Sequence, residues 1–385
     1  MKIAYVYDAV YPYVKGGGER RIYEVANRLN GRGHEIHIFG AQYWGGDPCY
    51  RNNGIYYHGF GKAAPLYHSS GRRSISQALY FGLQSWRLLA EMRFDVIDCG
   101  QWPYFHLLPA KLYSLSRGSH FVVTWYEVWK KHWLEYMGKA GLAGLLVEKT
   151  FCHLPEKLAA VSQLTQRDLV DIGVHADRVV VIPNGIDYQR IRSLPAGSTP
   201  THLAYCGRLK NHKNVDVMIR AVALMKQDLP DVSAVIIGTG PEEQRLREMA
   251  RSLQVENNII FTGAIEDFDD VVKWLKSSRI FVNASTKEGG GSITLFEANA
   301  CGLPAIAIKC ENGIDPSLIR DGENGYFVNA LSPELIAKLA LGLLQDQERL
   351  IRNSEVSLKM ASTYDWDEIA SQYETLYYQL QLEGR

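Results

Sequence analysis

The sequence predicts an α/β fold made of two successive Rossmann-like domains, each a parallel β-sheet covered by helices. Short apolar runs alternate with amphipathic stretches along the chain, which is the pattern of buried parallel strands joined by helices. The length of 385 residues is more than one hydrophobic core usually organises. The alternation also stops near residues 183–200, where Pro and Gly cluster, and then begins again. These three features indicate two domains of similar size.

The first domain begins with an apolar run, a glycine-rich loop and an amphipathic helix. The helix starts near Glu19, carries its apolar residues on one face, and ends at Gly31 and Gly33, because glycine commonly terminates helices. The strands expected in this domain are Ile3–Tyr7, Glu35–Phe39, Asp95–Asp98, His120–Thr124, Leu158–Val161 and Val179–Ile182.

The second domain repeats the alternation after a linker at residues 195–200. The tail has helical spacing and is rich in Tyr and Leu. We therefore place the domains at residues 1–187 and 188–364, and expect residues 365–385 to form a helix that crosses back to the first domain. The strands expected in the second domain are Leu203–Cys206, Ser233–Ile237, Asn258–Phe261, Arg279–Val282 and Pro304–Ile308.

The composition argues against several classes of protein. Lys+Arg and Asp+Glu both number 42, and this zero formal net charge is unlike that of a nucleic-acid-binding protein. The six cysteines include no Cys-x-x-Cys pair, so we expect neither a zinc site nor disulfides. No histidine spacing indicates a metal, and we expect no metal or other cofactor. The first apolar run is too short for a secretory signal, so we expect a cytoplasmic protein.

Three consecutive glycines, Gly16, Gly17 and Gly18, lie between the first strand and the first helix. Glycines allow the backbone to approach a ligand closely, and the amides at a helix N-terminus favour an anion. The spacing differs from the dinucleotide motif G-x-G-x-x-G, so NAD binding is not indicated. Taken alone, a flexible turn between strand and helix explains the motif at least as well.

A basic loop occupies the corresponding place in the second domain. Arg208 and Lys213 follow the strand Leu203–Cys206, and open α/β sheets bind ligands beyond the carboxyl ends of their strands. Arginine can bind two phosphate oxygens and lysine supplies a point charge, so the loop suits a pyrophosphate. Taken alone, a solvated basic loop would be the better explanation.

A second glycine-rich loop, with Glu288 and Gly289–Gly291, follows the strand Arg279–Val282 and opens a helix that carries Glu297. Carboxylates suit sugar recognition, because each can accept two hydroxyl hydrogen bonds. An exposed helical glutamate is the alternative for Glu297, but its apolar neighbours favour a buried carboxylate with a partner.

Several short motifs occur in one order along the chain. They are Pro12…Lys15-Gly16-Gly17, Asn184-Gly185-Ile186-Asp187, Gly207-Arg208-Leu209 with Lys213, Ile237-Gly238-Thr239-Gly240-Pro241, Phe261-Thr262-Gly263 and Glu288…Glu297-Ala298. In this order they closely resemble the retaining glycosyltransferases of family four, which have the GT-B architecture of two Rossmann-like domains facing across a cleft. The resemblance covers nearly the whole chain and is densest from Val179 to Asn329.

The resemblance implies an activity. The chain would move a sugar from a nucleoside-diphosphate sugar, for which we expect a UDP-sugar, with retention of configuration and without a metal. The acceptor would be a sugar, a lipid-linked sugar or a small molecule, bound by the first domain.

The resemblance also implies roles for single residues. Arg208 and Lys213 would hold the diphosphate, Glu288 the transferred sugar and Glu297 the ribose, and Tyr126 stands at the family's catalytic position. The donor-binding set would be Gly16, Gly17, Gly18, Arg208, Lys213, Gly238, Ile265, Ser285, Glu288, Gly289, Gly290, Gly291, Ser292 and Glu297.

The chain departs from the family pattern at two places. Eight residues separate Glu288 from Glu297, where the family has seven, and Tyr126 stands where members commonly have a histidine. His132 is the next candidate if Tyr126 serves only in packing. The departures support a second interpretation, a non-catalytic nucleotide-sugar-binding subunit or regulator. An epimerase or phosphorylase of the same architecture is a third.

Two further features allow more than one interpretation. Asp267-Phe268-Asp269 has the D-x-D spacing of metal-dependent glycosyltransferases, but it lies at an expected helix start, where acidic residues cap the helix. We favour capping. The stretch Arg72–Arg93 combines arginines with large apolar residues, and peripheral membrane contact is the alternative to the core helix that we favour there.

Overall fold

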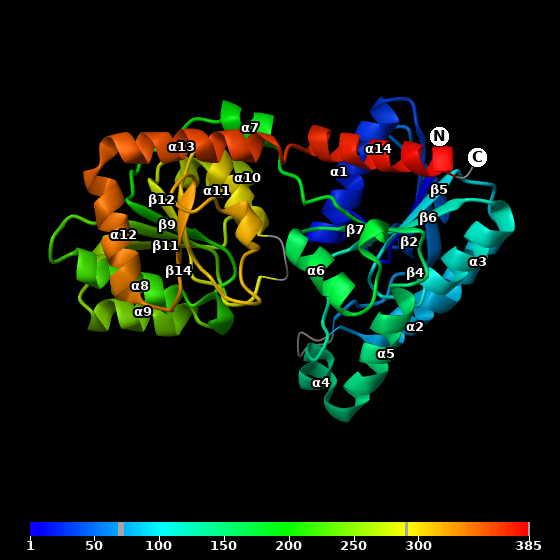
Figure 1. Cartoon of the computed structure of the whole chain (residues 1–385), viewed down its shortest axis with the longest axis horizontal. Helices are drawn as coiled ribbons and strands as arrows, with labels where there is room; N and C mark the ends of the chain where they lie inside the picture. The colour runs from blue at the N-terminus through cyan, green and yellow to red at the C-terminus, as the bar shows by residue number, and fades with distance from the viewer. Residues whose placement is uncertain (68–72, 289–291, 384–385) are drawn as a thin grey trace. The chain divides into compact units, whose positions relative to one another are not determined.

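The computed structural model describes residues 1–67, 73–288 and 292–383. The chain forms two compact units, and Figure 1 follows it through both. The first unit comprises Met1–Asn184 and Trp366–Arg385, and the second comprises Gly185–Asp365. The two ends of the second unit are joined to each other, because the Ile186 amide donates to the Tyr364 carbonyl at 2.8 Å.

The first unit is built on an eight-stranded sheet in the order β3-β4-β2-β1-β5-β6-β7-β8. Its strand pairs are parallel except the β3–β4 hairpin, so the loops after β1, β5 and β6 meet at one edge. The strands are β1 (Lys2–Val6), β2 (Glu35–Gln42), β3 (Cys49–Asn52), β4 (Ile55–Lys62), β5 (Val96–Gly100), β6 (His120–Trp125), β7 (Lys157–Ala160) and β8 (Val179–Val181).

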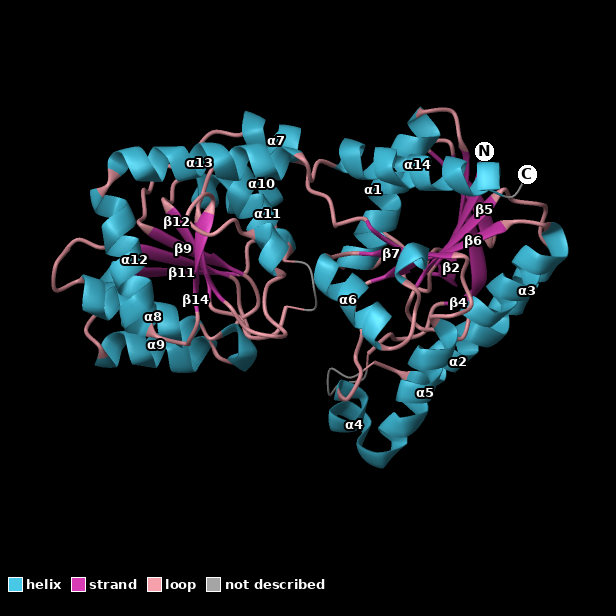
Figure 2. Cartoon of the chain, viewed as in Figure 1, coloured by secondary structure: helices cyan, strands magenta, loops and turns pink. Residues whose placement is uncertain are grey.

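Helices cover both faces of this sheet (Figure 2). The first and last helices, α1 and α14, pack against each other over one apolar cluster, and α2, α3 and α5 cover a second cluster. The helices are α1 (Gly17–Gly31), α2 (Ile75–Gln84), α3 (Leu107–Arg117), α4 (His132–Met137), α5 (Gly141–Phe151), α6 (Gln163–Asp171) and α14 (Trp366–Glu383), with 3₁₀ turns η1 (Ser85–Ala90), η2 (Gly138–Ala140) and η3 (Ala176–Arg178).

The second unit contains a six-stranded parallel sheet in the order β11-β10-β9-β12-β13-β14. The strands are β9 (Leu203–Cys206), β10 (Ala234–Ile237), β11 (Ile259–Gly263), β12 (Ile280–Asn283), β13 (Ala305–Ile308) and β14 (Gly325–Val328). The helices are α7 (Tyr188–Ser193), α8 (Val215–Met225), α9 (Glu243–Ser252), α10 (Phe268–Lys276), α11 (Ile293–Ala300), α12 (Pro333–Gln345) and α13 (Gln347–Ser362), with η4 (Asn211–Lys213), η5 (Glu256–Asn258) and η6 (Pro316–Leu318).

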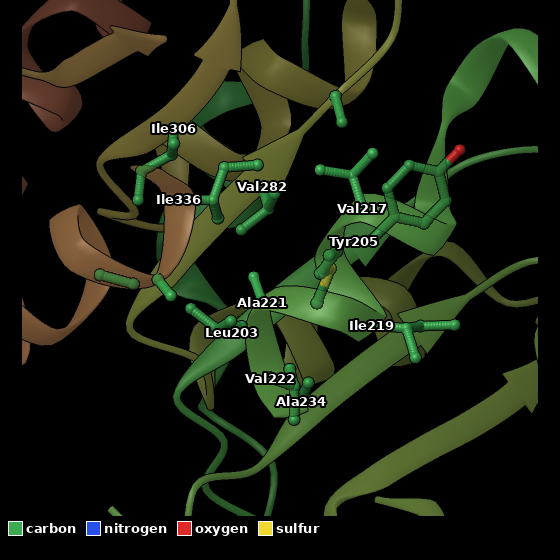
Figure 3. Packing of buried hydrophobic residues seen from close by; sticks show 14 of the residues in the cluster. Leu203, Tyr205, Val217, Ile219, Ala221, Val222, Ala234, Val282, Ile306 and Ile336 are labelled. Carbon is green, nitrogen blue, oxygen red and sulfur yellow. The ribbon is translucent and has the colours of Figure 1, made fainter. Parts of the chain in front are cut away.

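One of the apolar clusters of the second unit packs between the sheet and a set of helices that includes α8. Ala221 and Val222 of α8 lie next to Leu203 and Ala234 of two adjacent strands (Figure 3), and all four side chains are buried. This packing holds α8 against β9 and β10. The loop with the predicted diphosphate ligands joins β9 to α8.

All the expected strands are present, with ends shifted by at most three residues. Three strands were not expected: the β3–β4 hairpin and β14. Asn53 and Gly54 both have positive φ, 48° and 87°, as a type I′ hairpin turn requires. The dipeptide Asn53-Gly54 was therefore the signal in the sequence for that hairpin.

Candidate active site

The candidate site of the second unit lies beyond the carboxyl ends of its central strands. The loops after β9, β10 and β12 are tied to one another by their backbones. The Leu209 amide donates to the Thr239 carbonyl at 3.0 Å, and the Thr286 amide donates to the His212 carbonyl at 3.0 Å. The loops therefore form one connected surface at the edge of the sheet where ligands bind in folds of this class.

Glycines make the close approach of these loops feasible. Gly238 has φ +128°, and a Cβ atom there would lie only 2.0 Å from the Gly207 carbonyl oxygen. A Cβ on Gly240 would likewise lie 2.3 Å from the Leu209 carbonyl oxygen. Both positions exclude a side chain. The predicted donor-binding residue Gly238 thus has a packing requirement in addition to any contact with a ligand.

Lys213 and Glu288 face each other in the site. The Lys213 Nζ lies 2.9 Å from Glu288 Oε1, and the Glu288 side chain is only 8% exposed. Asn283, at the end of β12, donates from Nδ2 to the same carboxylate oxygen at 3.2 Å. The three residues line a pocket of about 190 Å³, together with the backbone at Gly207. A buried carboxylate thus has two donors in a cavity open to a polar ligand.

Arg208 differs from Lys213 in its surroundings. Its side chain is exposed, and it forms no ion pair with a described residue. Its carbonyl accepts a hydrogen bond from the buried Tyr205 hydroxyl at 3.1 Å, which fixes the backbone at that point. The loop therefore presents a guanidinium without an acidic partner among the described residues, five residues from a lysine that already has a carboxylate partner.

The other predicted donor residues of this unit occupy different surroundings. Ser285 is fully buried, and its hydroxyl donates to the Lys287 carbonyl within its own loop at 3.1 Å. Ser292 precedes α11 and is buried beside Thr294, at 3.2 Å between the hydroxyl oxygens. Ile265 is half-buried and packs with the apolar residues under α10. Gly289, Gly290 and Gly291 lie outside the described residues.

Glu297 is buried on α11 with 7% of its surface exposed. Burial raises the pKa of Cys206 to about 12, and the negative charge of Glu297 is the second cause of this increase. The Glu297 carboxylate therefore lies near the carboxyl end of β9, as does the basic loop. The prediction of a buried carboxylate at this position is confirmed.

The Asp267-Phe268-Asp269 segment caps a helix. Asp267 is the N-cap of α10, and its carboxylate accepts the Asp269 amide at 3.0 Å. Asp269 forms an ion pair with Arg190 at 2.8 Å. Both carboxylates thus have protein partners, which supports the capping interpretation over a metal-binding one.

In the first unit, the glycine-rich loop begins α1 and packs on two phenols. Gly16 is the N-cap of α1, and the helix itself starts at Gly17. A Cβ on Gly18 would lie 3.1 Å from the hydroxyl oxygens of both Tyr126 and Tyr7. These tyrosines thus pack directly against the backbone at Gly18.

Tyr126 is held at its backbone, while its hydroxyl has no partner in the described part of the chain. The Tyr126 amide donates to the Gln101 Oε1 atom at 2.8 Å. The centres of the Tyr126 and Tyr7 rings lie 6.2 Å apart. The Tyr126 hydroxyl is buried and makes no hydrogen bond among the described residues. Burial raises its pKa well above the ordinary value, so it stays a neutral donor. His132 is the alternative candidate for the catalytic position. Its Nδ1 atom lies 2.7 Å from Glu135 Oε2, and its ring packs against Trp129.

Two polar positions were missed by the sequence analysis. Asn283 orders Glu288, and Gln101 positions the backbone at Tyr126 and Glu127. Each follows or ends a strand whose carboxyl end borders a candidate loop. That position in the strand pattern was the available signal, because polar residues at strand ends often serve sites.

Sequence profiles identify the family of the chain. The profile "Glycosyl transferases group 1" matches residues 189–357, and "Glycosyltransferase Family 4" matches residues 15–190. The two profiles together span residues 15–357 and leave no gap between the two units. The chain is a family 4, group 1 glycosyltransferase.

The curated relatives of this glycosyltransferase agree with that assignment. An uncharacterized glycosyltransferase of Methanocaldococcus jannaschii is 26% identical over 279 residues, which is 70% of this chain and 68% of that protein. Two other curated relatives are covered over only 33% and 45% of their own length.

Two solved structures share the fold of this glycosyltransferase. Sucrose-phosphate synthase from Thermosynechococcus elongatus superposes with a TM-score of 0.79 at 16% identity, over 99% of both chains. The Anabaena protein HepE, solved in complex with UDP, superposes with a TM-score of 0.74 at 18% identity, over 98% of this chain and 99% of that one. The glycosyltransferase therefore has the GT-B fold.

Proposed function

We propose that this glycosyltransferase transfers a sugar from a nucleoside-diphosphate sugar with retention of configuration and without a metal ion. The observation that carries the proposal is the basic loop after β9, with an exposed Arg208 that has no ion-pair partner among the described residues. A diphosphate would supply the missing negative charge. The UDP found in the HepE complex, which has the same fold, supports a UDP-sugar as the donor.

The pair of Lys213 and Glu288 suggests how the site would change when the donor binds. The ammonium of Lys213 would turn from the Glu288 carboxylate to a phosphate oxygen, where it and Arg208 stabilise the leaving diphosphate. Glu288, still held by Asn283, would then accept hydroxyl hydrogen bonds from the transferred sugar. In this proposal the ion pair keeps both side chains ordered until a donor replaces it.

The remaining roles follow from where the side chains lie. Glu297, buried beside the end of β9, would bind the ribose hydroxyls, and Ile265 would lie beside the base. Fixed cations at the leaving group would make a metal unnecessary, because they stabilise the charge that develops there. The leaving phosphate would take the acceptor proton on the same face of the sugar, which gives retention. The acceptor would be a sugar, a lipid-linked sugar or a small molecule.

Product analysis tests this proposal. The purified protein is incubated with a panel of nucleoside-diphosphate sugars and acceptors, with and without a chelator, and the anomeric configuration of the product is read by NMR. We expect a product with the donor's configuration and a rate that the chelator leaves unchanged. An inverted product or loss of activity with the chelator would contradict the mechanism. Donor binding without any turnover would support the non-catalytic alternative.

A further inference from the structure

The helices on one side of the first unit leave many large apolar side chains exposed. Nine residues of α2, η1, α3 and α5 are between 40% and 68% exposed, and we call them the apolar face. They are Ile75, Leu79, Leu83, Trp86, Leu108, Leu112, Leu115, Leu142 and Leu146.

The elements that carry the apolar face are neighbours. Both α2 and α3 pack against η1. A methyl group on Gly82 of α2 would lie 2.5 Å from the Cβ atom of Phe105, just before α3. The Phe105 ring in turn lies 6.5 Å from the ring of Phe151 at the end of α5. In Figure 1, α2 lies between α3 and α5 along the same side of the unit.

These helices are apolar on two sides. Ala78, Phe81 and Leu88 of α2 and η1 are buried in the core of the unit, while Leu79 and Leu83 of the same segment point outward. An amphipathic helix of a globular protein normally presents polar residues on its outer side. Many exposed apolar side chains on neighbouring helices are typical of a site of interaction.

The charged residues of these helices are nearly all of one sign. The only acidic residue in α2, η1, α3 and α5 is Glu148, which is buried and accepts two backbone amides. The basic residues are Arg87, Lys111, Arg117 and Lys149, and none forms an ion pair with a described residue. Exposed apolar side chains on helices that also carry basic residues fit the interface of an anionic membrane.

We propose that the apolar face docks on the surface of a bilayer containing anionic lipids. The leucines and Trp86 would enter the boundary between head groups and acyl chains, while Arg87 and Lys149 would contact lipid phosphates. No helix in the described part of the chain has the length and apolarity of a membrane span, so the contact is peripheral. A symmetric dimer through the same face would instead bring like charges together.

Vesicle flotation of the whole protein tests the proposal without a donor, so its result is independent of the transfer reaction. The vesicles contain phosphatidylcholine alone or mixed with phosphatidylglycerol. We expect flotation with the mixed vesicles, weakened by salt and much lower with phosphatidylcholine alone. No flotation, or equal flotation with both lipids, would overturn the proposal.

Variants with a matched control locate the contact. Leu83→Glu should weaken flotation by about 10- to 100-fold, the value of one buried leucine. The double variant Arg87→Gln/Lys149→Gln should weaken it by about 25-fold, at roughly fivefold per basic residue. Ile351→Glu on α13, where the wild-type residue is 57% exposed, should behave as wild type.

Two outcomes with these variants would place the contact elsewhere. Equal loss in Leu83→Glu and Ile351→Glu would show that the apolar face is not the membrane contact. Size-exclusion chromatography without lipid tests the alternative that a second copy of the chain binds this face. A wild-type dimer that Leu83→Glu dissociates would make this face a subunit interface and overturn the proposal.

Discussion

At the scale of single residues, Tyr126 shows how the site differs from the pattern that it resembles. The position lies directly after β6, as a catalytic residue at a sheet edge would. Its hydroxyl, however, lies under Gly18 and makes no hydrogen bond among the described residues. A buried hydroxyl without a partner is costly, and such groups in folded proteins usually have a reason.

Tyr126→Phe distinguishes a functional hydroxyl from a packing one. Removing the hydroxyl breaks no hydrogen bond that the structure shows, so we expect an unchanged or slightly higher Tm. If the hydroxyl donates to the sugar or acceptor in the transition state, kcat should fall by about 10- to 100-fold. Melting curves and steady-state rates measure the two effects separately. Unchanged kcat would show that Tyr126 only packs.

The carboxylate of Asp98 gives the first unit a pH-dependent stability. Burial raises its pKa to about 6, although hydroxyl donors from Tyr377, at 2.6 Å, and Thr124, at 3.2 Å, oppose the shift. Between about pH 4 and pH 6 the folded state holds a proton that the unfolded state releases. The free energy of unfolding should therefore fall as the pH rises through this window, by about 3 kcal/mol.

Asp98→Asn tests this assignment. The variant has no carboxyl group to titrate, so its denaturation midpoint should fall less than that of wild type between about pH 4 and pH 6. Asp228→Asn, at an exposed position of the second unit, is the matched control and should keep the wild-type slope. Identical slopes in Asp98→Asn and wild type would contradict the raised pKa.

At the scale of elements, one buried arginine is among the residues that hold the last helix in the first unit. Arg21 of α1 is 1% exposed and donates from Nε to the Tyr373 hydroxyl of α14 at 2.8 Å. It also donates to the carbonyls of Ile182 and Pro183, both at 2.7 Å. The same guanidinium thus holds both α14 and the segment that leads out of the unit.

Arg21→Met should loosen α14. The substitution keeps much of the side-chain length but leaves two carbonyls and the Tyr373 hydroxyl without this donor, at a cost of about 3 to 5 kcal/mol. Hydrogen exchange of residues 366–383 should accelerate, and the Tm should fall. Arg20→Met, whose wild-type side chain is 32% exposed, should change both by much less. Equal effects of the two substitutions would refute the anchoring role.

Some elements were easier to predict from the sequence than others. Buried parallel strands were predictable, because an apolar run such as Leu203–Cys206 has few alternatives between two helical patterns. The edge strands were less so: Cys49–Asn52 (β3) has no continuous apolar run and is indicated only by the Asn53-Gly54 turn, and β14 has only the three apolar residues Tyr326–Val328. The contact between Lys213 and Glu288 could not be predicted from the sequence, because it joins two loops that are 75 residues apart along the chain.

At the scale of the whole molecule, the two units repeat one design. Each is a sheet with parallel strands in which a polar or glycine-rich loop joins the carboxyl end of a central strand to the next helix. In the first unit this loop contains Lys15 and Gly16, and in the second it contains Arg208 and Lys213. The ordered motifs predicted the family because they fall on these loops. The uncompensated charge of Arg208 needed the structure, since only the fold shows which acidic residues lie nearby.

In the proposed function, the basic loop of the second unit holds the diphosphate of the donor. Isothermal titration of the protein with UDP and UDP-sugars measures this directly, for wild type, Arg208→Ala and the control Lys210→Ala. Lys210 is exposed and lies two residues away in the same loop, so the control loses the same charge at a neighbouring position. We expect Arg208→Ala to weaken binding by roughly 10- to 1,000-fold, with Lys210→Ala close to wild type. Equal affinity of Arg208→Ala and wild type for every nucleotide that binds would contradict the account.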